Sequence, residues 1–378
     1  MKDRGRHLMS FTEKKREEIK KYILRKITLD DADIIAKTKD NFGISLTSVK
    51  RYLQEIVDSG AVRKAEEQNC GYCLAEQIFS YTVSLAERRA AEDELYASCI
   101  AGHLDHCNEK AMRIWQYTCA EILNNAIEHA QGSKLYIEVR TNVLYVTIAV
   151  VDDGIGTFHT LLTYMKAHGW ENPGIEEALV ELYKGKITSR EENHSGEGIF
   201  FSGKMLDDFA LWSDNCIYKC GAGKNPETIQ SHLLSYASRM EKVGTMVLMR
   251  IENETERDIA EVFNMYTDID EGFVKTKIPV KEACINGEPV ARSQARRICN
   301  RLETFKEVIL DFQDVEFMGQ GFADEIFRVF AIAHPQVILR PVNMLPVVAR
   351  MIRHVSRGTI PENICLEQCT RQNTCSVR

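Results

Sequence analysis

The sequence has no run that approaches the roughly 18 consecutive apolar residues of a membrane-spanning helix. It also lacks the charged start and apolar stretch that mark a secretory signal peptide. We therefore expect a cytoplasmic protein without membrane contact. The chain has 378 residues, of which 44% are apolar, so it can form separate cores in two or three domains.

Complete sets of metal ligands are also missing, although the chain has 12 cysteines. Cys70 with Cys73, and Cys216 with Cys220, could together make a four-thiolate zinc site. Both pairs adjoin predicted strands, and nothing in the sequence brings them together, so reduced thiols are favoured. The cysteines near the C-terminus lack a fourth ligand and lie in a predicted polar tail, 359–378.

Residues 121–129 read Glu-Ile-Leu-Asn-Asn-Ala-Ile-Glu-His. Residues four apart share one face of a helix, so Glu121, Asn125 and His129 form a polar stripe while Ile122 and Ala126 can turn toward a core. A carboxylate and a carboxamide one turn apart suit a site for a magnesium nucleotide. The alternative is an ordinary amphipathic helix with a solvated polar face.

Glycine clusters follow this helix in a fixed order. An apolar run typical of a buried strand, 144–151, ends in Asp-Asp-Gly-Ile-Gly. An acid at a strand end can accept a hydrogen bond from the adenine amine, and glycine lets the backbone approach a ligand closely. A second glycine pair opens a predicted helix, and a threonine starts a later strand. The residues singled out are Asp152, Gly154, Gly156, Ser195, Gly196, Gly198 and Thr245.

These elements, in this order, resemble the GHKL ATPase superfamily of gyrase, histidine kinases, heat-shock chaperones and anti-sigma-factor serine kinases. The resemblance implies an ATP-binding α/β sandwich over residues 69–265, with ATP and Mg²⁺ as cofactors. It implies that Asn125 binds Mg²⁺, that Asp152 selects adenine, that the glycines with the intervening segment wrap the phosphates, and that Thr245 belongs to the cofactor site. The 121–129 motif is most similar to the anti-sigma-factor kinases, in which the residue equivalent to Glu121 acts as general base.

The segment 157–195 is too long for a simple connection between the glycine clusters. We interpret it as an ATP lid. Lys184, Lys186 or Arg190 could then reach the terminal phosphate of the nucleotide.

The first 64 residues contain 16 Lys and Arg against 10 Asp and Glu, a net charge of +6 in a chain of net −7. Helices are predicted at 12–26, 31–38 and 45–58, followed by a hairpin after Gly60. The third helix is predicted to turn five residues inward: Leu46, Val49, Leu53, Ile56 and Val57.

This arrangement over residues 1–68 resembles a winged helix-turn-helix. The resemblance implies that the outer face of the third helix contacts double-stranded DNA through Thr47, Ser48, Lys50 and Arg51. The alternative is a winged helix that makes only protein contacts.

Strands and helices alternate again over 270–358, which predicts an α/β layer. The stretch from Val308 resembles a STAS-like domain, akin to the anti-anti-sigma fold. Those domains carry a phosphoacceptor hydroxyl where this chain has Gly319-Gln-Gly321, so we do not expect this domain to be phosphorylated there. The predicted fold is thus α+β and multi-domain: a winged helix, an α/β-sandwich ATPase domain and an α/β STAS-like domain.

Three functions remain open at this point. The first is an ATP- and Mg²⁺-dependent switch that controls binding of DNA or a regulatory protein. The second is a serine/threonine kinase that acts on a separate STAS partner, and the third is a slow ATPase. The lack of a phosphoacceptor-histidine hairpin before Glu121 argues against a sensor histidine kinase. The sequence also leaves a homodimer possible.

Overall fold

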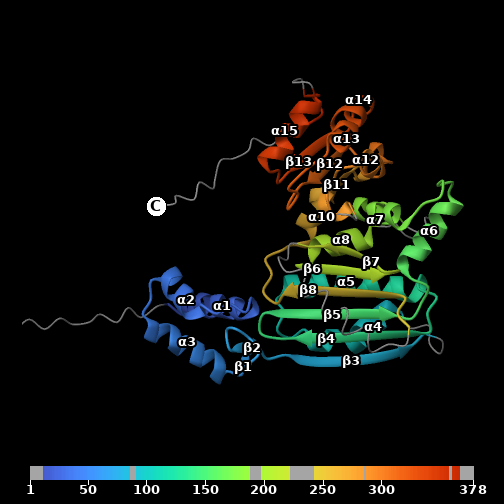
Figure 1. Cartoon of the computed structure of the whole chain (residues 1–378). Coiled ribbons are helices and arrows are strands. Elements are labelled where there is room, and N and C mark those ends of the chain that lie inside the picture. The colour runs from blue at the N-terminus through green and yellow to red at the C-terminus, as the bar shows by residue number, and fades with distance from the viewer. Residues whose placement is uncertain are drawn as a thin grey trace, which may run out of the picture.

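A computed structural model describes residues 12–85, 91–187, 197–221, 242–284, 287–356 and 360–366. The protein is α+β: a small helical module precedes a six-stranded sheet with helices, and a smaller α/β unit follows (Figure 1). Among these residues, no helix has both the length and the apolar content needed to cross a membrane.

The N-terminal module contains the predicted three helices and hairpin. Thr12 and Ser45 accept hydrogen bonds from backbone N–H groups of the first turns of α1 and α3, and Gly43 ends α2 with a φ of 61°. Two details of the prediction are wrong. The second helix begins at Ile34 rather than residue 31, and Leu46 is 50% exposed while Tyr52 fills the core instead. The elements are α1 (Glu13–Thr28), α2 (Ile34–Phe42), α3 (Leu46–Asp58), β1 (Val62–Lys64) and β2 (Tyr72–Leu74).

The central sheet has the order β3-β4-β5-β8-β6-β7, and every neighbouring pair is antiparallel. Helix α5 packs on β5 and β8, and α8 packs on β6, so both helices lie on one face of the sheet (Figure 1). Strand β4 was not predicted, and the strand that starts at Thr245 is central in the sheet. The strands are β3 (Gln77–Ser84), β4 (Lys134–Thr141), β5 (Tyr145–Asp152), β6 (Asp208–Ser213), β7 (Cys216–Cys220) and β8 (Thr245–Glu252). The helices on this side are α4 (Glu92–Cys99), η1 (Ala101–His103), α5 (Glu109–Glu128) and α8 (Gly198–Met205).

The described part of the expected lid, residues 157–187, contains two helices, α6 (Thr157–Ala167) and α7 (Ile175–Lys184). Gly174 precedes α7, where the Glu177 side chain accepts a hydrogen bond from the Gly174 N–H, and Gly185 ends the helix with a φ of 84°. Every side chain of α7 from Ala178 to Lys184 is buried. This helix is therefore part of the packed interior rather than a solvated flap.

The C-terminal unit has a parallel sheet in the order β11-β12-β13. The first of these strands was not predicted, whereas β12, β13 and the helices after them were. The elements are α10 (Ile259–Tyr266), β9 (Thr267–Asp268), β10 (Gly272–Phe273), β11 (Lys275–Pro279), α11 (Val280–Ala283), α12 (Arg292–Cys299), η2 (Leu302–Thr304), β12 (Glu307–Asp311), α13 (Gln320–Asp324), the π-helical η3 (Glu325–Phe330), α14 (Ala331–Ala333), β13 (Ile338–Val342) and α15 (Pro346–Val355).

Buried apolar side chains form clusters of very different extent. One cluster runs without a break from α4 and α5 through α7 and α8 into the C-terminal sheet and α15. A second cluster holds the N-terminal module together and, among the described residues, reaches the central domain at Leu144 and Tyr145, where β5 begins. The C-terminal unit thus shares a core with the central sheet, and the N-terminal module has its own.

Candidate nucleotide site

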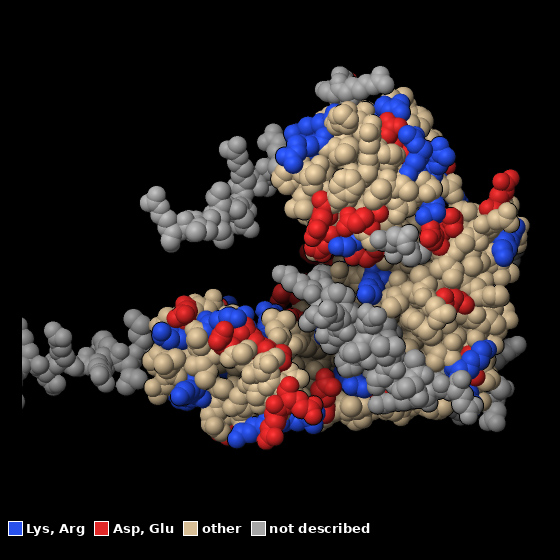
Figure 2. Space-filling model, in the orientation of Figure 1, with Lys and Arg blue, Asp and Glu red and all other residues tan. Residues whose placement is uncertain are grey.

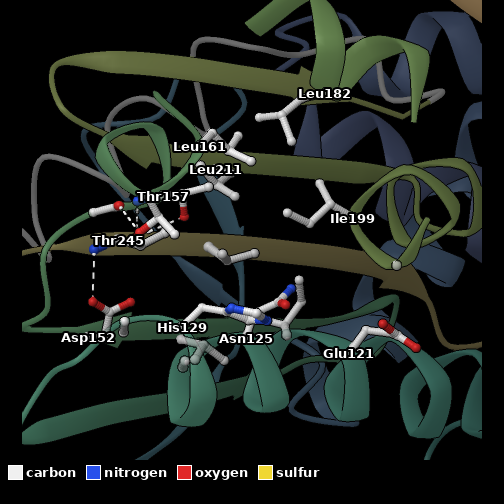
Figure 3. A pocket seen from close by; sticks show the side chains of 18 of the residues that line it. Glu121, Asn125, His129, Asp152, Thr157, Leu161, Leu182, Ile199, Leu211 and Thr245 are labelled. Carbon is white, nitrogen blue, oxygen red and sulfur yellow. Dashed lines mark hydrogen bonds between the residues drawn. The ribbon is translucent and has the colours of Figure 1, made fainter. Parts of the chain in front are cut away.

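The predicted motifs meet at a cavity of about 270 Å³ on the helical side of the sheet. Its lining comes from α5, α6, α7, α8 and the strands β5, β6 and β8 (Figure 3). Polar groups lie along α5 and at the ends of β5 and β8, whereas Leu161, Leu182 and Leu211 form an apolar wall opposite them. An apolar cavity with a few convergent polar groups is typical of a small-molecule site.

Helix α5 supplies the predicted polar stripe. Glu121, Asn125 and His129 all line the cavity, as do Ile122 and Ala126, whose side chains are almost fully buried. Asn108 caps the start of α5 by accepting a hydrogen bond from the Ala111 N–H at 2.8 Å. The helix therefore presents its carboxylate, carboxamide and imidazole on successive turns along one wall of the cavity.

Asp152 ends β5 near His129, lines the cavity and is only 4% exposed (Figure 3). Its Oδ1 accepts hydrogen bonds from the N–H groups of Gly154 at 2.8 Å and Thr245 at 3.2 Å (Figure 3). Burial raises the pKa of Asp152 to about 6, although both hydrogen bonds oppose the shift. Its Oδ2 takes part in no hydrogen bond among the described residues, so this oxygen can accept one from a ligand.

The neighbouring Asp153 has a different role. Its carboxylate accepts hydrogen bonds from the backbone N–H groups of Ser133 and Lys134 and from the Ser133 hydroxyl, at 2.6 to 2.9 Å. Burial alone would raise its pKa, but these hydrogen bonds lower the pKa of Asp153 below its usual value. Asp153 therefore fixes the start of β4, and Asp152 is the acid that faces the cavity.

The glycines of the first cluster allow the loop after β5 to pack tightly. Gly156 lies directly before α6 and has a φ of 94°, a backbone conformation that residues other than glycine rarely adopt. A Cβ at Gly154 would lie 2.0 Å from the carbonyl oxygen of Ala130. No larger residue fits at Gly154 while the loop stays closed over the end of α5.

The second glycine cluster contributes Gly198, the first residue of α8. A Cβ at this position would lie 2.0 Å from Oε2 of Glu121, so the Glu121 carboxylate rests directly against the backbone of α8. Burial and the nearby Glu121 carboxylate raise the pKa of Glu197, and the Lys186 ammonium partly offsets this. Ser195 and Gly196, together with Arg190, lie outside the described residues.

Thr245 lines the cavity at the start of β8, and its hydroxyl joins this strand to α6. It accepts a hydrogen bond from the Thr157 N–H at 3.0 Å, and the two threonine hydroxyls are also 3.0 Å apart. Ser213 accepts from the same N–H at 2.9 Å. Both α6 and α8 begin at the cavity, and the first N–H of α6 is bonded to side chains of the sheet.

Sequence reasoning missed the contribution of α7. Leu182 and the following Ile187 line the cavity, but no local pattern shows which side of a buried helix faces a ligand. The prediction that Lys184 reaches a phosphate is wrong, because its ammonium is 1% exposed and donates to Glu181 and to carbonyl groups of the C-terminal unit. Lys186 likewise donates to the carbonyl oxygen of Thr304 at 2.9 Å.

The cysteine pairs are far apart in the fold. Cys70 and Cys73 lie at the small β1–β2 hairpin, whereas Cys216 and Cys220 are the ends of β7, in a different sheet. All four are free thiols. Within the described ranges, no group of three or more histidine, cysteine, aspartate or glutamate side chains is arranged to hold a metal ion.

The comparisons with known proteins identify the C-terminal region. A family model for a STAS-like domain of unknown function (DUF4325) matches residues 294–348, from α12 into α15, and confirms this part of the prediction. No curated protein matches the chain. The resemblance of the central domain to GHKL ATPases, and of the N-terminal module to a winged helix, therefore rests on the sequence motifs described above and not on a matching family model.

Of the two glycines at the position of the missing phosphoacceptor, Gly319 is closed to larger side chains, whereas a Cβ at Gly321 would lie 3.7 Å from its nearest neighbour. A Cβ at Gly319, which precedes α13, would lie 2.3 Å from the carbonyl oxygen of Val290. A serine or threonine therefore does not fit at this position without a shift of the backbone.

Proposed function

We propose that the central domain binds ATP with Mg²⁺ in this cavity, as a GHKL-type nucleotide switch whose occupancy controls the terminal domains. The observation that carries the proposal is the convergence of separate sequence motifs on one cavity: Asn125, Asp152, Gly156, Gly198 and Thr245 all line it. These residues come from four different elements and the loop after β5. Their common location is unexpected if each motif were only an ordinary turn or helix face.

The residues present fit the proposed ligand. Asp152 offers a buried oxygen for the exocyclic amine of adenine, and the apolar wall suits the faces of the base. The Asn125 carboxamide would hold Mg²⁺, which offsets the charge of the phosphates when it is bound. Gly198 has no side chain of its own, so the start of α8 can lie directly against the Glu121 carboxylate in the wall of the cavity.

The proposal is tested by comparing Asn125→Ala with Asn124→Ala. Both substitutions remove the same carboxamide from adjacent positions of α5, but only Asn125 lines the cavity. We expect Asn125→Ala to abolish the Mg²⁺-dependent part of ATP binding in isothermal titration, and Asn124→Ala to bind as the wild type does. Equal affinities of the two variants for Mg²⁺–ATP would refute the assignment of Asn125.

Glu121 supports a second activity, transfer of the terminal phosphoryl group to a separate protein. Its carboxylate is one helical turn from Asn125, where a general base can remove a proton from an attacking hydroxyl or water. The fused STAS-like domain is not the acceptor at residues 319–321, because Gly319, Gln320 and Gly321 have no hydroxyl group. Incubation with γ-labelled ATP and cell lysate separates the cases: label on another protein supports the kinase, and release of phosphate alone supports the ATPase.

DNA is the partner proposed for the N-terminal module, because the outer face of α3 is open. Thr47, Lys50 and Arg51 are exposed, and Ser48 is half-buried beside the cap residue Ser45. Figure 2 shows positive and negative side chains mixed on the side of the module that faces the viewer.

Replacing Lys50 and Arg51 together with alanine should weaken binding to duplex DNA. If each side chain neutralises one phosphate, the slope of log affinity against log salt falls by about one to two units. Fluorescence anisotropy over a range of salt concentrations measures this slope. Wild-type protein without any salt-dependent DNA binding would instead indicate a module for protein contacts.

A further inference from the structure

Helix α7 has one side on the cavity and another on the STAS-like domain. Leu182 lines the cavity, and so does Ile187 just beyond the end of the helix. Two residues along from Leu182, Lys184 points into the C-terminal unit and is 1% exposed. Figure 1 shows α7 between the central layers and this unit. A shift of α7 at the cavity therefore also changes its contacts with the STAS-like domain.

Lys184 makes the most specific of these contacts. Its ammonium donates to Oε1 of Glu181 at 2.6 Å, to the carbonyl oxygen of Arg297 at 3.3 Å, and to the carbonyl oxygen of Asn300. Asn300 is the C-cap of α12, so the lysine satisfies carbonyl groups that the end of this helix leaves without partners. Because a buried ammonium must keep its hydrogen-bond acceptors, these three oxygens fix the position of the Lys184 side chain between α7 and the end of α12.

Further contacts hold the same helix from both ends. The Thr276 hydroxyl of β11 donates to the Lys184 carbonyl oxygen at 3.0 Å. Arg297 of α12 pairs with Glu176 and lies 3.8 Å from Glu177, both in the first turn of α7. The two helices are thus joined reciprocally: each has a cation that contacts the other.

Helix α8, which also begins at the cavity, contacts the region leading into the C-terminal sheet. The rings of Phe200 and Phe201 lie 4.9 and 5.5 Å from the ring of Phe273, which in turn packs edge-on against Phe305 of the STAS-like unit. Lys204 of α8 donates to the carbonyl oxygen of Lys277 in β11 at 3.3 Å. Both cavity-lining helices on this side therefore have their other faces against the same unit.

We infer that the STAS-like domain senses the occupancy of the cavity through α7, and that Lys184 is a positioning residue for this coupling. The choice of ATP as the effector rests on the proposed nucleotide function. The coupling itself rests only on α7, whose movement at Leu182 is transmitted to the end of α12. Coupling of this kind commonly changes an equilibrium by about 5- to 150-fold.

The first experiment uses Mg²⁺–ATP and hydrogen–deuterium exchange of the full chain. In the wild type, saturating Mg²⁺–ATP should change the exchange rates of amides in α12 and η2, which do not line the cavity, by at least about fivefold. The double variant Glu181→Gln with Lys184→Met removes both members of the buried ion pair, so that neither charge is left alone. It should bind ATP without this response, whereas Lys166→Met, at an exposed position of α6, should keep it.

The second experiment needs no nucleotide. Leu182→Ala and Leu161→Ala each shorten one leucine in the wall of the same cavity, the first on α7 and the second on α6. Only Leu182→Ala should speed exchange in α12 and η2, and it should do so by at least about fivefold. Failure of ATP to bind the wild type would refute the nucleotide function, while this second comparison still decides the coupling. Equal responses to the two leucine variants, or ATP binding without any change in α12, would overturn the inference.

Discussion

The central domain has two junctions, and they differ in kind. At the C-terminal junction, a buried lysine, an aromatic cluster and a continuous apolar core join α7 and α8 to the STAS-like unit. At the N-terminal junction, Lys21 and Arg25 of α1 pair with Glu252 and Glu254 at the end of β8, at 2.8 to 3.6 Å, and the four side chains are 23 to 73% exposed. Buried contacts transmit strain, whereas exposed ion pairs are weak and screened by salt.

This difference indicates how each terminal domain can respond. The STAS-like unit is built into the same core as the cavity, so it moves with the walls of the cavity. The N-terminal module has its own core and touches the sheet mainly at Leu144 and Tyr145. Its orientation can therefore change at small cost without disturbing the cavity.

The largest expected effect is at the buried junction. Lys184→Met leaves the buried Glu181 carboxylate without its partner and removes the cation at the end of α12, which should lower the free energy of unfolding by about 3 to 5 kcal/mol. Lys21→Met at the exposed junction is the matched control and should cost less than about 1 kcal/mol. Urea denaturation of both variants measures the difference, and similar losses would contradict the comparison.

The next effect concerns Asp152, in the part of the core that both units share. Asp152→Asn should weaken ATP binding by about 1.5 to 3 kcal/mol, since a charged acceptor for the adenine amine becomes neutral. The same substitution should stabilise the protein without nucleotide at neutral pH. The pKa of Asp152 is about 6 in the folded protein, against a usual 3.8. The buried carboxylate therefore lowers the free energy of unfolding by about 3 kcal/mol above pH 6, and this loss disappears below about pH 4.

The pH dependence follows from the same shift. Because the carboxylate must be ionised to accept well, wild-type ATP affinity should fall about tenfold between pH 7.5 and 5, as Asp152 becomes protonated through its pKa of about 6. Protonation of the ATP phosphates affects wild type and Asp152→Asn alike, so the ratio of their affinities isolates Asp152. A ratio that does not change with pH would show that Asp152 does not contact the nucleotide.

The smallest effect is at the N-terminal junction itself. Replacing Lys21 and Arg25 together with alanine should lower stability by about 1 kcal/mol or less, and the loss should shrink as salt is raised toward 1 M. The ATP affinity should stay the same. A loss of several kcal/mol that persists at high salt would mean that this junction is as rigid as the other.

The sequence predicted which residues line the candidate site better than it predicted the elements around them. Glu121, Asn125, Asp152 and Thr245 stand in local patterns whose geometry is set by one helix or one strand end, and the structure brings them to the same cavity. Helix α7 could not be predicted, because its burial depends on α12, more than 100 residues later in the chain. Long-range packing of this kind leaves no periodic signal within a short window.

Two smaller errors in the secondary-structure prediction also arise from long-range packing. Leu46 is apolar and fits the helical period, yet it lies in the first turn of α3, where the chain leaves the core and the side chain is exposed. Strand β11 is short and carries alternating lysines, which pair with Glu307 and Asp311 of β12. Those acids become partners only once the sheet has formed, so the local sequence alone does not predict this strand.

The distance along the chain between Lys184 and its acceptors has a consequence for biosynthesis. The lysine is bonded to carbonyl oxygens 113 and 116 residues downstream. While the ribosome is still making α12, the Lys184 ammonium has only Glu181 and water as partners, and α7 can pack only on elements made earlier, such as α6, α8 and β7. The last contacts that hold α7 beside the cavity, those with α12, therefore form only after this part of the STAS-like segment has been made.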